Sequence, residues 1–151
     1  MTITASPSAT ASPSASSVPP LALALPWGLR SPAVARRIAA RWLEAADCER
    51  TADAVLVVSE LVTNAVRHTR GPCLLTLTDH GASLDIAVTD HSEELPDVHR
   101  PPNGDQRGGF GLEIMRRVGD SVRVVPRLGG KTVHVALLVR TQPPRDRRSP
   151  P

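Results

Sequence analysis

The segment from Thr51 to Arg70 places the strongest constraint on how this chain can fold. Its apolar residues recur at helical spacing around most of the circumference, which predicts a long helix that is largely buried. Thr51 is expected to cap its start, and Gly71-Pro72 forms a strong stop. A helix this apolar needs other elements to cover it, which indicates a layered domain. The apolar residues are Ala54, Val55, Val58, Leu61, Val62, Ala65 and Val66.

Shorter patterns before and after this helix complete the first half of the fold. The apolar run Leu21–Leu25, which a proline ends, is typical of a short edge strand. Ser31-Pro32 is expected to start a helix that runs to about Ala46, because Ser caps helices and Pro suits the first turn. Apolar and polar residues then alternate up to Asp90 on both sides of His80-Gly81, which predicts a β-hairpin.

The second half contains a long loop, a third helix and a final hairpin. Residues 91–107 are polar and rich in proline, and a connection of this length is usually functional or a lid. Gly108–Gly111 opens a helix, and a hairpin over residues 122–137 turns at Gly129-Gly130. The resulting order predicts an α+β fold, a two-layer α/β sandwich in which helices cover one face of a mixed, mostly antiparallel sheet.

Composition divides the chain into one domain and two tails. Residues 1–20 are almost entirely Ser, Thr, Ala and Pro, and residues 141–151 are similarly poor in large apolar side chains. Neither segment can bury enough surface to offset chain entropy, so we expect both to be disordered. Hydrophobic residues make up 40% of the chain, enough for one core, which we expect within residues 21–140.

Charge and composition exclude several functional classes. The net charge of +3 is too weak to indicate nucleic-acid binding, and aromatic residues, at 2%, are too few for a base-stacking platform. No apolar run is long enough to span a bilayer or to form a signal peptide, so no membrane or direct nucleic-acid partner is expected. Cys48 and Cys73 lack metal-ligand spacing and indicate a reduced, cytoplasmic compartment.

A polar stripe interrupts the apolar helix. Glu60, Asn64 and His68 follow one another at four-residue spacing and therefore share one face. A solvent-exposed stripe is the simpler interpretation of this spacing. A helix this apolar is expected to be buried, however, and a buried carboxylate needs a partner or a catalytic role. A carboxylate and a carboxamide one turn apart suit Mg²⁺ coordination and activation of a hydroxyl.

Two further features are candidates for the same site. Asp90 ends a strand and opens the long loop, where it is either a turn residue or an acceptor for an exocyclic amine such as that of adenine. Gly108–Gly111 precedes a helix, and glycines there let backbone N–H groups approach phosphate oxygens. The alternative is that these glycines only punctuate a loop.

Together these features resemble the histidine-kinase-like ATPases, in particular the stand-alone anti-sigma-factor serine kinases of that superfamily. The stretch Val58–His68 is similar to the N box of that branch. Asp90 is similar to the aspartate of the first glycine box, and Gly109–Leu112 to the second box. Lys131-Thr132 is similar to the late strand that carries a threonine near the adenine. The resemblance covers residues 21–138 and implies the histidine-kinase-like ATPase fold with ATP and Mg²⁺ as cofactors.

The resemblance also implies a role for each matched residue. Glu60 would be the general base for the attacking hydroxyl, Asn64 would hold Mg²⁺, and Arg67 would lie near the phosphates. Asp90 would bind the adenine amino group, directly and through water shared with Thr132. The implied nucleotide-binding set is Asn64, Arg67, His68, Asp90, Gly108, Gly109, Gly111, Leu112 and Thr132.

Two hypotheses for the function follow. The first is an enzyme, an anti-sigma-factor-type serine/threonine kinase that phosphorylates an anti-sigma antagonist and sequesters a sigma factor, motivated by Glu60 and Asn64. The second is a catalytically weak ATP-binding module that acts only through protein–protein interaction in a regulatory switch. It is motivated by the run His91–Pro96, which lacks the glycines that follow the aspartate in the first box. The family relation also implies a homodimer.

Overall fold

A computed structural model describes residues 18–93 and 110–139 of the chain. The expectations for the tails at 1–17 and 141–151, and for most of the long loop, lie outside these residues. The described part contains five strands and three helices in the order β1, α1, α2, β2, β3, α3, β4, β5. This order is the predicted one.

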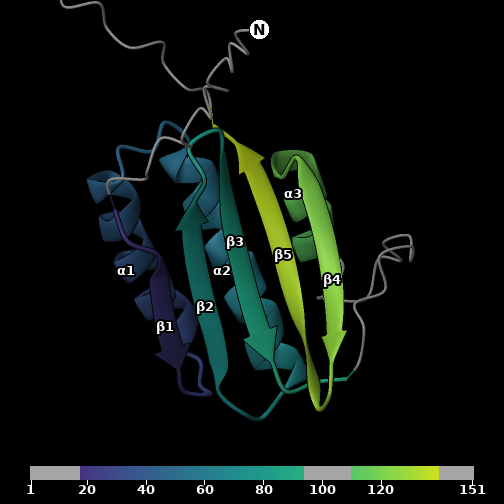
Figure 1. The fold of residues 1–151 in the computed structure, drawn as a ribbon. Helices are drawn as coiled ribbons and strands as arrows, with labels where there is room; N and C mark the ends of the chain where they lie inside the picture. Colours follow the sequence, from purple (N-terminus) through teal and green to yellow (C-terminus); the bar gives the residue numbers. More distant parts are fainter. Residues whose placement is uncertain (1–17, 94–109, 140–151) are drawn as a thin grey trace, which may run out of the picture.

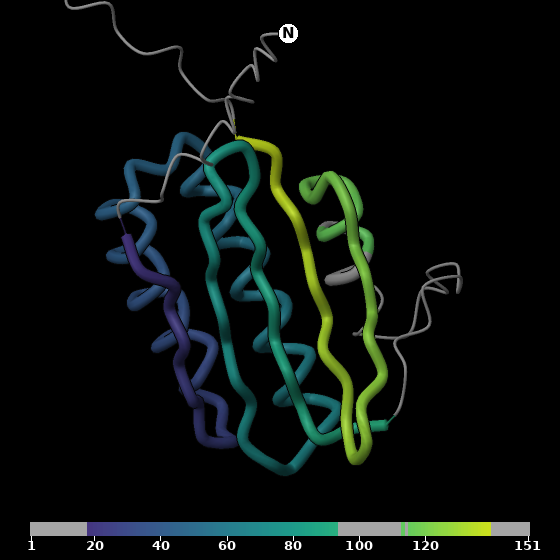
Figure 2. Tube along the Cα trace, viewed as in Figure 1, coloured from purple at the N-terminus to yellow at the C-terminus, as the bar shows by residue number. Residues whose placement is uncertain are grey.

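The strands form a single sheet in the order β1-β2-β3-β5-β4 (Figures 1 and 2). Every pairing among the described strands is antiparallel, so the expected mixed sheet is in fact uniformly antiparallel here. The final hairpin folds back so that β5 lies beside β3, which leaves β1 and β4 at the edges. Pro126 is tolerated because it lies on the edge strand β4. The strands are β1 (Leu21–Leu25), β2 (Cys73–Asp79), β3 (Ser83–Asp90), β4 (Ser121–Arg127) and β5 (Gly130–Leu138).

All three helices lie on one face of the sheet, behind it in the view of Figure 1. They are α1 (Ser31–Ala45), α2 (Thr51–His68) and α3 (Phe110–Val118). The central helix α2 packs on β2, β3 and β5 and is flanked by α1 and α3. This arrangement confirms the predicted two-layer α+β sandwich. None of these helices is long and apolar enough to cross a bilayer.

The starts of α1 and α2 differ in detail from the predicted caps. The residues before the two helices, Arg30 and Arg50, occupy the cap positions, and neither forms a side-chain cap. Ser31 and Thr51 lie one residue inside, where their hydroxyls donate backward to the carbonyl oxygens of Pro26 and Cys48. The hydroxyls therefore tie each helix to its preceding turn and leave the first helical N–H groups without the side-chain acceptor that a cap supplies.

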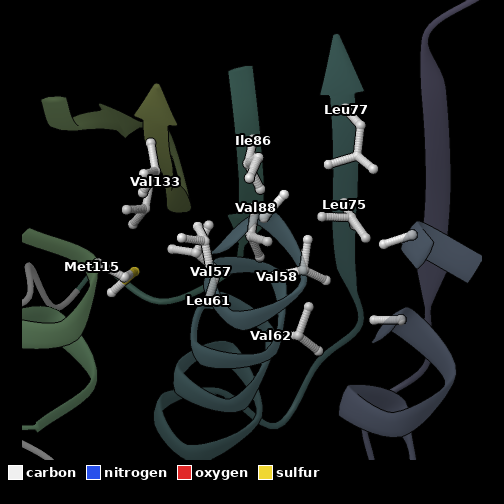
Figure 3. Close-up of a cluster of buried hydrophobic side chains, with 14 of the residues drawn as sticks. Val57, Val58, Leu61, Val62, Leu75, Leu77, Ile86, Val88, Met115 and Val133 are labelled. Carbon is white, nitrogen blue, oxygen red and sulfur yellow. The ribbon is translucent and has the colours of Figure 1, made fainter. Parts of the chain in front are cut away.

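The core lies between α2 and the sheet. Figure 3 shows four α2 side chains, Val57, Val58, Leu61 and Val62, directed at the sheet, where they meet apolar residues of β2 and β3. Burying each such side chain contributes roughly 1.5–3 kcal/mol, so this layer accounts for much of the driving force for folding. The opposing strand residues are Leu75, Leu77, Ile86 and Val88.

Candidate functional site

Glu60 and Asn64 lie one turn apart on the flank of α2 nearest α3. Val57 and Leu61, their neighbours on that side of the helix, point toward Met115 of α3 in Figure 3. Successive residues rotate by about 100° around a helix. Glu60 and Asn64, three residues after Val57 and Leu61 respectively, therefore lie on the same side of α2 but further from the core. Both side chains are partly exposed there. Of the two interpretations left open by the sequence, exposed stripe and buried carboxylate, the structure gives an intermediate outcome, because only one face of α2 packs on the sheet.

The polar groups of Glu60 and Asn64 make no hydrogen bond or ion pair to any other residue that the structure describes. A carboxylate and a carboxamide oxygen one turn apart are hard oxygen ligands of the kind that Mg²⁺ prefers. Within residues 18–93 and 110–139, no group of three or more His, Cys, Asp or Glu side chains forms a metal site. A cation at this flank would thus take its remaining ligands from water and phosphate, which suits Mg²⁺.

Arg67 and His68 form the last turn of α2 and are exposed. Both are within one turn of Asn64, so the structure keeps these three predicted residues at the same end of the helix. Basic side chains in a last helical turn also stabilise the negative end of the helix dipole. Their position is therefore explained by helix stability, and their proximity to phosphate stays a prediction.

Asp90 is the last residue of β3 and is only 5% exposed. Lys131, the one lysine of the chain, places its Nζ 3.0 Å from each carboxylate oxygen of Asp90. The Ser92 N–H donates to Oδ1 of Asp90 over 2.9 Å, which forms the turn that starts the long loop. Asp90 is therefore both the turn residue considered from sequence and one half of a buried ion pair that the sequence reasoning missed.

Strand register decides which residue of β5 meets Asp90. Asp90 is paired with Lys131, and Thr89 with Thr132, on neighbouring rungs of the β3–β5 ladder. Because side chains alternate between faces, Asp90 and Lys131 share the helix-covered face with Val88. The hydroxyls of Thr89 and Thr132 bond to each other over 2.8 Å on the opposite face. The structure thus does not bring the Thr132 hydroxyl to the Asp90 carboxylate, although sequence reasoning expected them to share a water molecule.

Gly130 allows this close approach of β5 to the end of β3. A side chain at Gly130 would place its Cβ only 2.0 Å from the carbonyl oxygen of Asp90. A residue with a Cβ cannot fit without moving the backbone of one strand. The sequence pattern predicts only a turn at Gly130. The one signal that could have drawn attention to its neighbour was a single lysine among 18 basic residues.

Cys73 lies beside Asp90 on the adjacent strand β2. Leu74 pairs with Thr89, so Cys73 stands at the end of the ladder next to Asp90 and on the same helix-covered face. Burial raises the pKa of the Cys73 thiol, and the negative charge of Asp90 raises it further. This end of the sheet is therefore a desolvated environment in which polar interactions are strong.

The glycines expected to contact phosphate are described only in part. Gly108 and Gly109 lie outside the described residues, and Gly111 and Leu112 belong to the first turn of α3, where their surroundings are not described. The other end of α3 is well defined. Arg50 at the start of α2 donates to the carbonyl oxygen of Val118 over 2.8 Å. This contact fixes α3 against α2.

Comparisons with known proteins support the same architecture. A solved structure of the RsbU and RsbW domains of Rv1364c from Mycobacterium tuberculosis superposes with a TM-score of 0.63 at 21% identity. The match covers 81% of this chain and 32% of the chain in that structure, so this chain spans about a third of that chain's length. The SiaB–SiaC complex from Pseudomonas aeruginosa matches with a TM-score of 0.56 at 12% identity, covering 80% of this chain and 89% of that chain. At these identities the likeness shows the fold alone.

A family model identifies the domain more specifically. Among curated proteins no relative matches. Residues 27–137, however, match the model of the histidine kinase-like ATPase domain, which covers well over half of the chain and includes α2, Asp90, α3 and Lys131. Membership in an ATPase family implies ATP binding. This chain belongs to the histidine kinase-like ATPase domain family.

Proposed function

We propose that this chain is an ATP-dependent serine/threonine kinase of the anti-sigma-factor type, which phosphorylates an anti-sigma antagonist. The observation that carries the proposal is the pair of available oxygen-bearing side chains, Glu60 and Asn64, on the flank of α2 nearest α3. Phosphoryl transfer depends mainly on positioning and charge neutralisation, and this flank offers both a base and a cation ligand.

Each side chain would have a distinct role. The Glu60 carboxylate would take the proton from a serine or threonine hydroxyl of the protein substrate, which raises the nucleophilicity of that oxygen. Asn64 would hold Mg²⁺ through its carboxamide oxygen, and the ion would supply charge neutralisation at the phosphates. Arg67 and His68, one turn further along, would add positive charge on the phosphate side.

The proposal extends to partners and location. A sigma factor and its anti-sigma antagonist are the proposed protein partners, and a homodimer is the proposed assembly. One structural neighbour, SiaB, was itself solved in complex with a second protein, SiaC, which supports a protein partner. The proposed location is the cytoplasm, where thiols such as those of Cys48 and Cys73 stay reduced.

Transfer of labelled phosphate from ATP to candidate antagonist proteins tests the enzyme. Glu60→Ala should lower the transfer rate by about 100-fold or more, the usual contribution of a general base, while ATP affinity changes little. Glu44→Ala, an exposed glutamate on α1, is the matched control and should keep full activity. Equal transfer rates in wild type and Glu60→Ala would remove Glu60 from the mechanism.

A catalytically weak ATP-binding module is the second candidate. It is favoured by the contacts of Asp90 with Lys131 and Ser92, because they take up part of the accepting capacity, and compensate the charge, that a bond to an adenine amino group would use. Calorimetry with Mg-ATP separates the candidates. Heat of binding without transfer to any antagonist supports the module, whereas binding with Glu60-dependent transfer supports the kinase. No heat and no thermal shift would leave a protein that acts only through protein contacts.

A further inference from the structure

The buried pair of Asp90 and Lys131 is the feature of this site that its predicted roles do not explain. The two side chains are 5% and 6% exposed and face each other across one rung of the ladder. Gly130, the residue before Lys131, has no side chain to collide with the carbonyl oxygen of Asp90, so the two strands can lie close together beside this rung. The ammonium group is buried against the Asp90 carboxylate, 3.0 Å from each of its oxygens.

A count of hydrogen-bonding capacity shows what the pair can still offer. A carboxylate can accept about four hydrogen bonds and an ammonium group donates three. Among the residues that the structure describes, Oδ1 of Asp90 receives the Ser92 N–H and Lys131, whereas Oδ2 is contacted by Lys131 only. Nζ of Lys131 lies equally far from both oxygens, so one N–H can be shared, and its contact with the Ser92 carbonyl oxygen is long at 3.4 Å. The pair thus retains an acceptor on Oδ2 and a donor on Nζ, side by side.

The remaining acceptor on Oδ2 of Asp90 and the remaining donor on Nζ of Lys131 determine which edges of a nucleotide base can bind to the pair. A carboxylate alone accepts from the amino group of adenine and repels a carbonyl oxygen at the same position. An ammonium group beside it can donate to that carbonyl oxygen, while the carboxylate accepts from the neighbouring ring N–H. The cation also weakens the bond to a neutral amine, because it already compensates the carboxylate charge in a desolvated site.

We propose that Lys131 is a specificity-determining residue that makes the base site accept 6-oxopurine nucleotides alongside ATP. The proposal rests on the proposed nucleotide site, with Asp90 as the residue that contacts the base. In this site Lys131 donates to the oxygen at position six of the purine or to the ring nitrogen N1 of adenine, and Asp90 accepts from the adjacent N–H donor.

Calorimetry with Mg-ATP, Mg-ITP and Mg-GTP tests the proposal. ITP differs from ATP only at the purine six position and N1, and GTP adds an amino group. The three ligands therefore vary only the edge of the base that is proposed to contact Lys131. Wild type should bind ATP and ITP with dissociation constants within about tenfold of each other. In Lys131→Thr and Lys131→Met the preference for ATP over ITP and GTP should grow by about tenfold or more, because the donor is gone.

Two further variants serve as controls. Lys131→Arg keeps the cation and should stay closer to the wild-type ratio than Lys131→Met. Arg123→Ala removes an exposed charge from β4 and should leave all three affinities unchanged.

Two results would overturn the proposal. The first is a wild-type preference for ATP over ITP above about tenfold. This measurement needs no variant, so it tests the proposal even if Lys131→Met fails to fold. The second is a ratio of ATP affinity to ITP affinity that stays unchanged in folded Lys131→Thr and Lys131→Met. This result would overturn the role of Lys131 and leave the proposed ATP-binding function intact. Absence of binding by any nucleotide to folded wild type and Lys131→Arg would instead overturn the proposed function and this proposal with it.

Discussion

The two ends of β5 carry ionic groups in opposite surroundings. Near Leu138, Arg50 binds Asp53 and Asp120 in a network whose side chains are 27–44% exposed. At the start of the strand, Lys131 and Asp90 are 5–6% exposed. If one member of the exposed network is removed, water can form hydrogen bonds with the groups that remain. If one member of the buried pair is removed, water cannot reach the charge that remains.

This difference indicates different purposes. The Arg50 network joins the start of α2 to the end of α3 and to β5, so its role is to assemble the scaffold. A buried ion pair, in contrast, is often no more stabilising than apolar residues of similar volume. A contribution to stability therefore does not by itself explain why Asp90 and Lys131 are charged. Their location at the candidate nucleotide site offers a second explanation, a role in binding. The following experiments test this comparison, beginning with the largest expected effect.

Asp90→Ala should lower the free energy of unfolding by about 3–5 kcal/mol, because it leaves the Lys131 ammonium buried without a partner. Urea denaturation of wild type and variant measures the change. The double variant Asp90→Leu with Lys131→Met should recover most of the loss, since it removes both charges. If Asp90→Ala is as stable as wild type, the pair is not buried as described, and the contrast between the two ends of β5 disappears.

Arg50→Ala should cost about 2 kcal/mol, the scale for losing hydrogen bonds from a charged group that water can partly replace. The same urea experiment compares it directly with Asp90→Ala. Arg50→Lys should restore only part of the loss, because an ammonium group lacks the planar fork that reaches Val118 and Asp120 together. A loss as large as that of Asp90→Ala would contradict the distinction between exposed and buried ionic groups.

Thr132→Val tests the neighbouring rung, whose polar contact is uncharged. Loss of its hydroxyl bond to Thr89 should cost about 1 kcal/mol, and Thr89→Val should behave alike. Replacing both residues with valine should cost less than the sum of the single changes, because no hydroxyl is then left without its partner. Additive losses in this double-mutant cycle would show that the two hydroxyls do not interact.

Acid should weaken the exposed network when Asp120 takes up a proton, at a lower pH than an unperturbed aspartate would. The hydrogen bond from the Leu138 N–H lowers the pKa of the Asp120 carboxyl, and Arg50 lowers it further. A carboxyl whose folded pKa is depressed contributes stability that is full above its unfolded pKa of about 3.9 and is lost as pH falls through the folded value. Asp120→Asn should therefore reduce the pH dependence of unfolding below about pH 4. An unchanged acid profile would mean that Asp120 gains nothing from these contacts.

Much of the fold could be predicted from local pattern. The period of the apolar residues in α2 and the alternation in the β2–β3 hairpin identified these elements close to their observed bounds. The spacing of Glu60 and Asn64 also placed them correctly on one flank. Their exposure was not predictable, because periodicity gives the direction of a side chain relative to its helix but not what packs there.

The site at the sheet end shows where local pattern is insufficient. The resemblance assigns a role to Thr132 within the matched pair Lys131-Thr132, and a match of this kind identifies a stretch of strand without saying which face each residue occupies. A shift of one residue moves a side chain to the other face of the sheet, so Lys131 and Thr132 lie on opposite faces. Only the pairing of Asp90 with Lys131 across β3 and β5 shows which of the two side chains lies on the face of the Asp90 carboxylate.

By itself the sequence determined the elements, their order and the candidate flank of α2, since each depends on the spacing of residues along a few turns or one hairpin. The tertiary structure alone decided strand register and burial, because both depend on residues far apart in the chain. Asp90 and Lys131 are 41 residues apart and meet only when β5 inserts beside β3. Only in the folded sheet do Asp90, a turn residue, and Lys131, the single lysine, form a buried ion pair at the candidate nucleotide site.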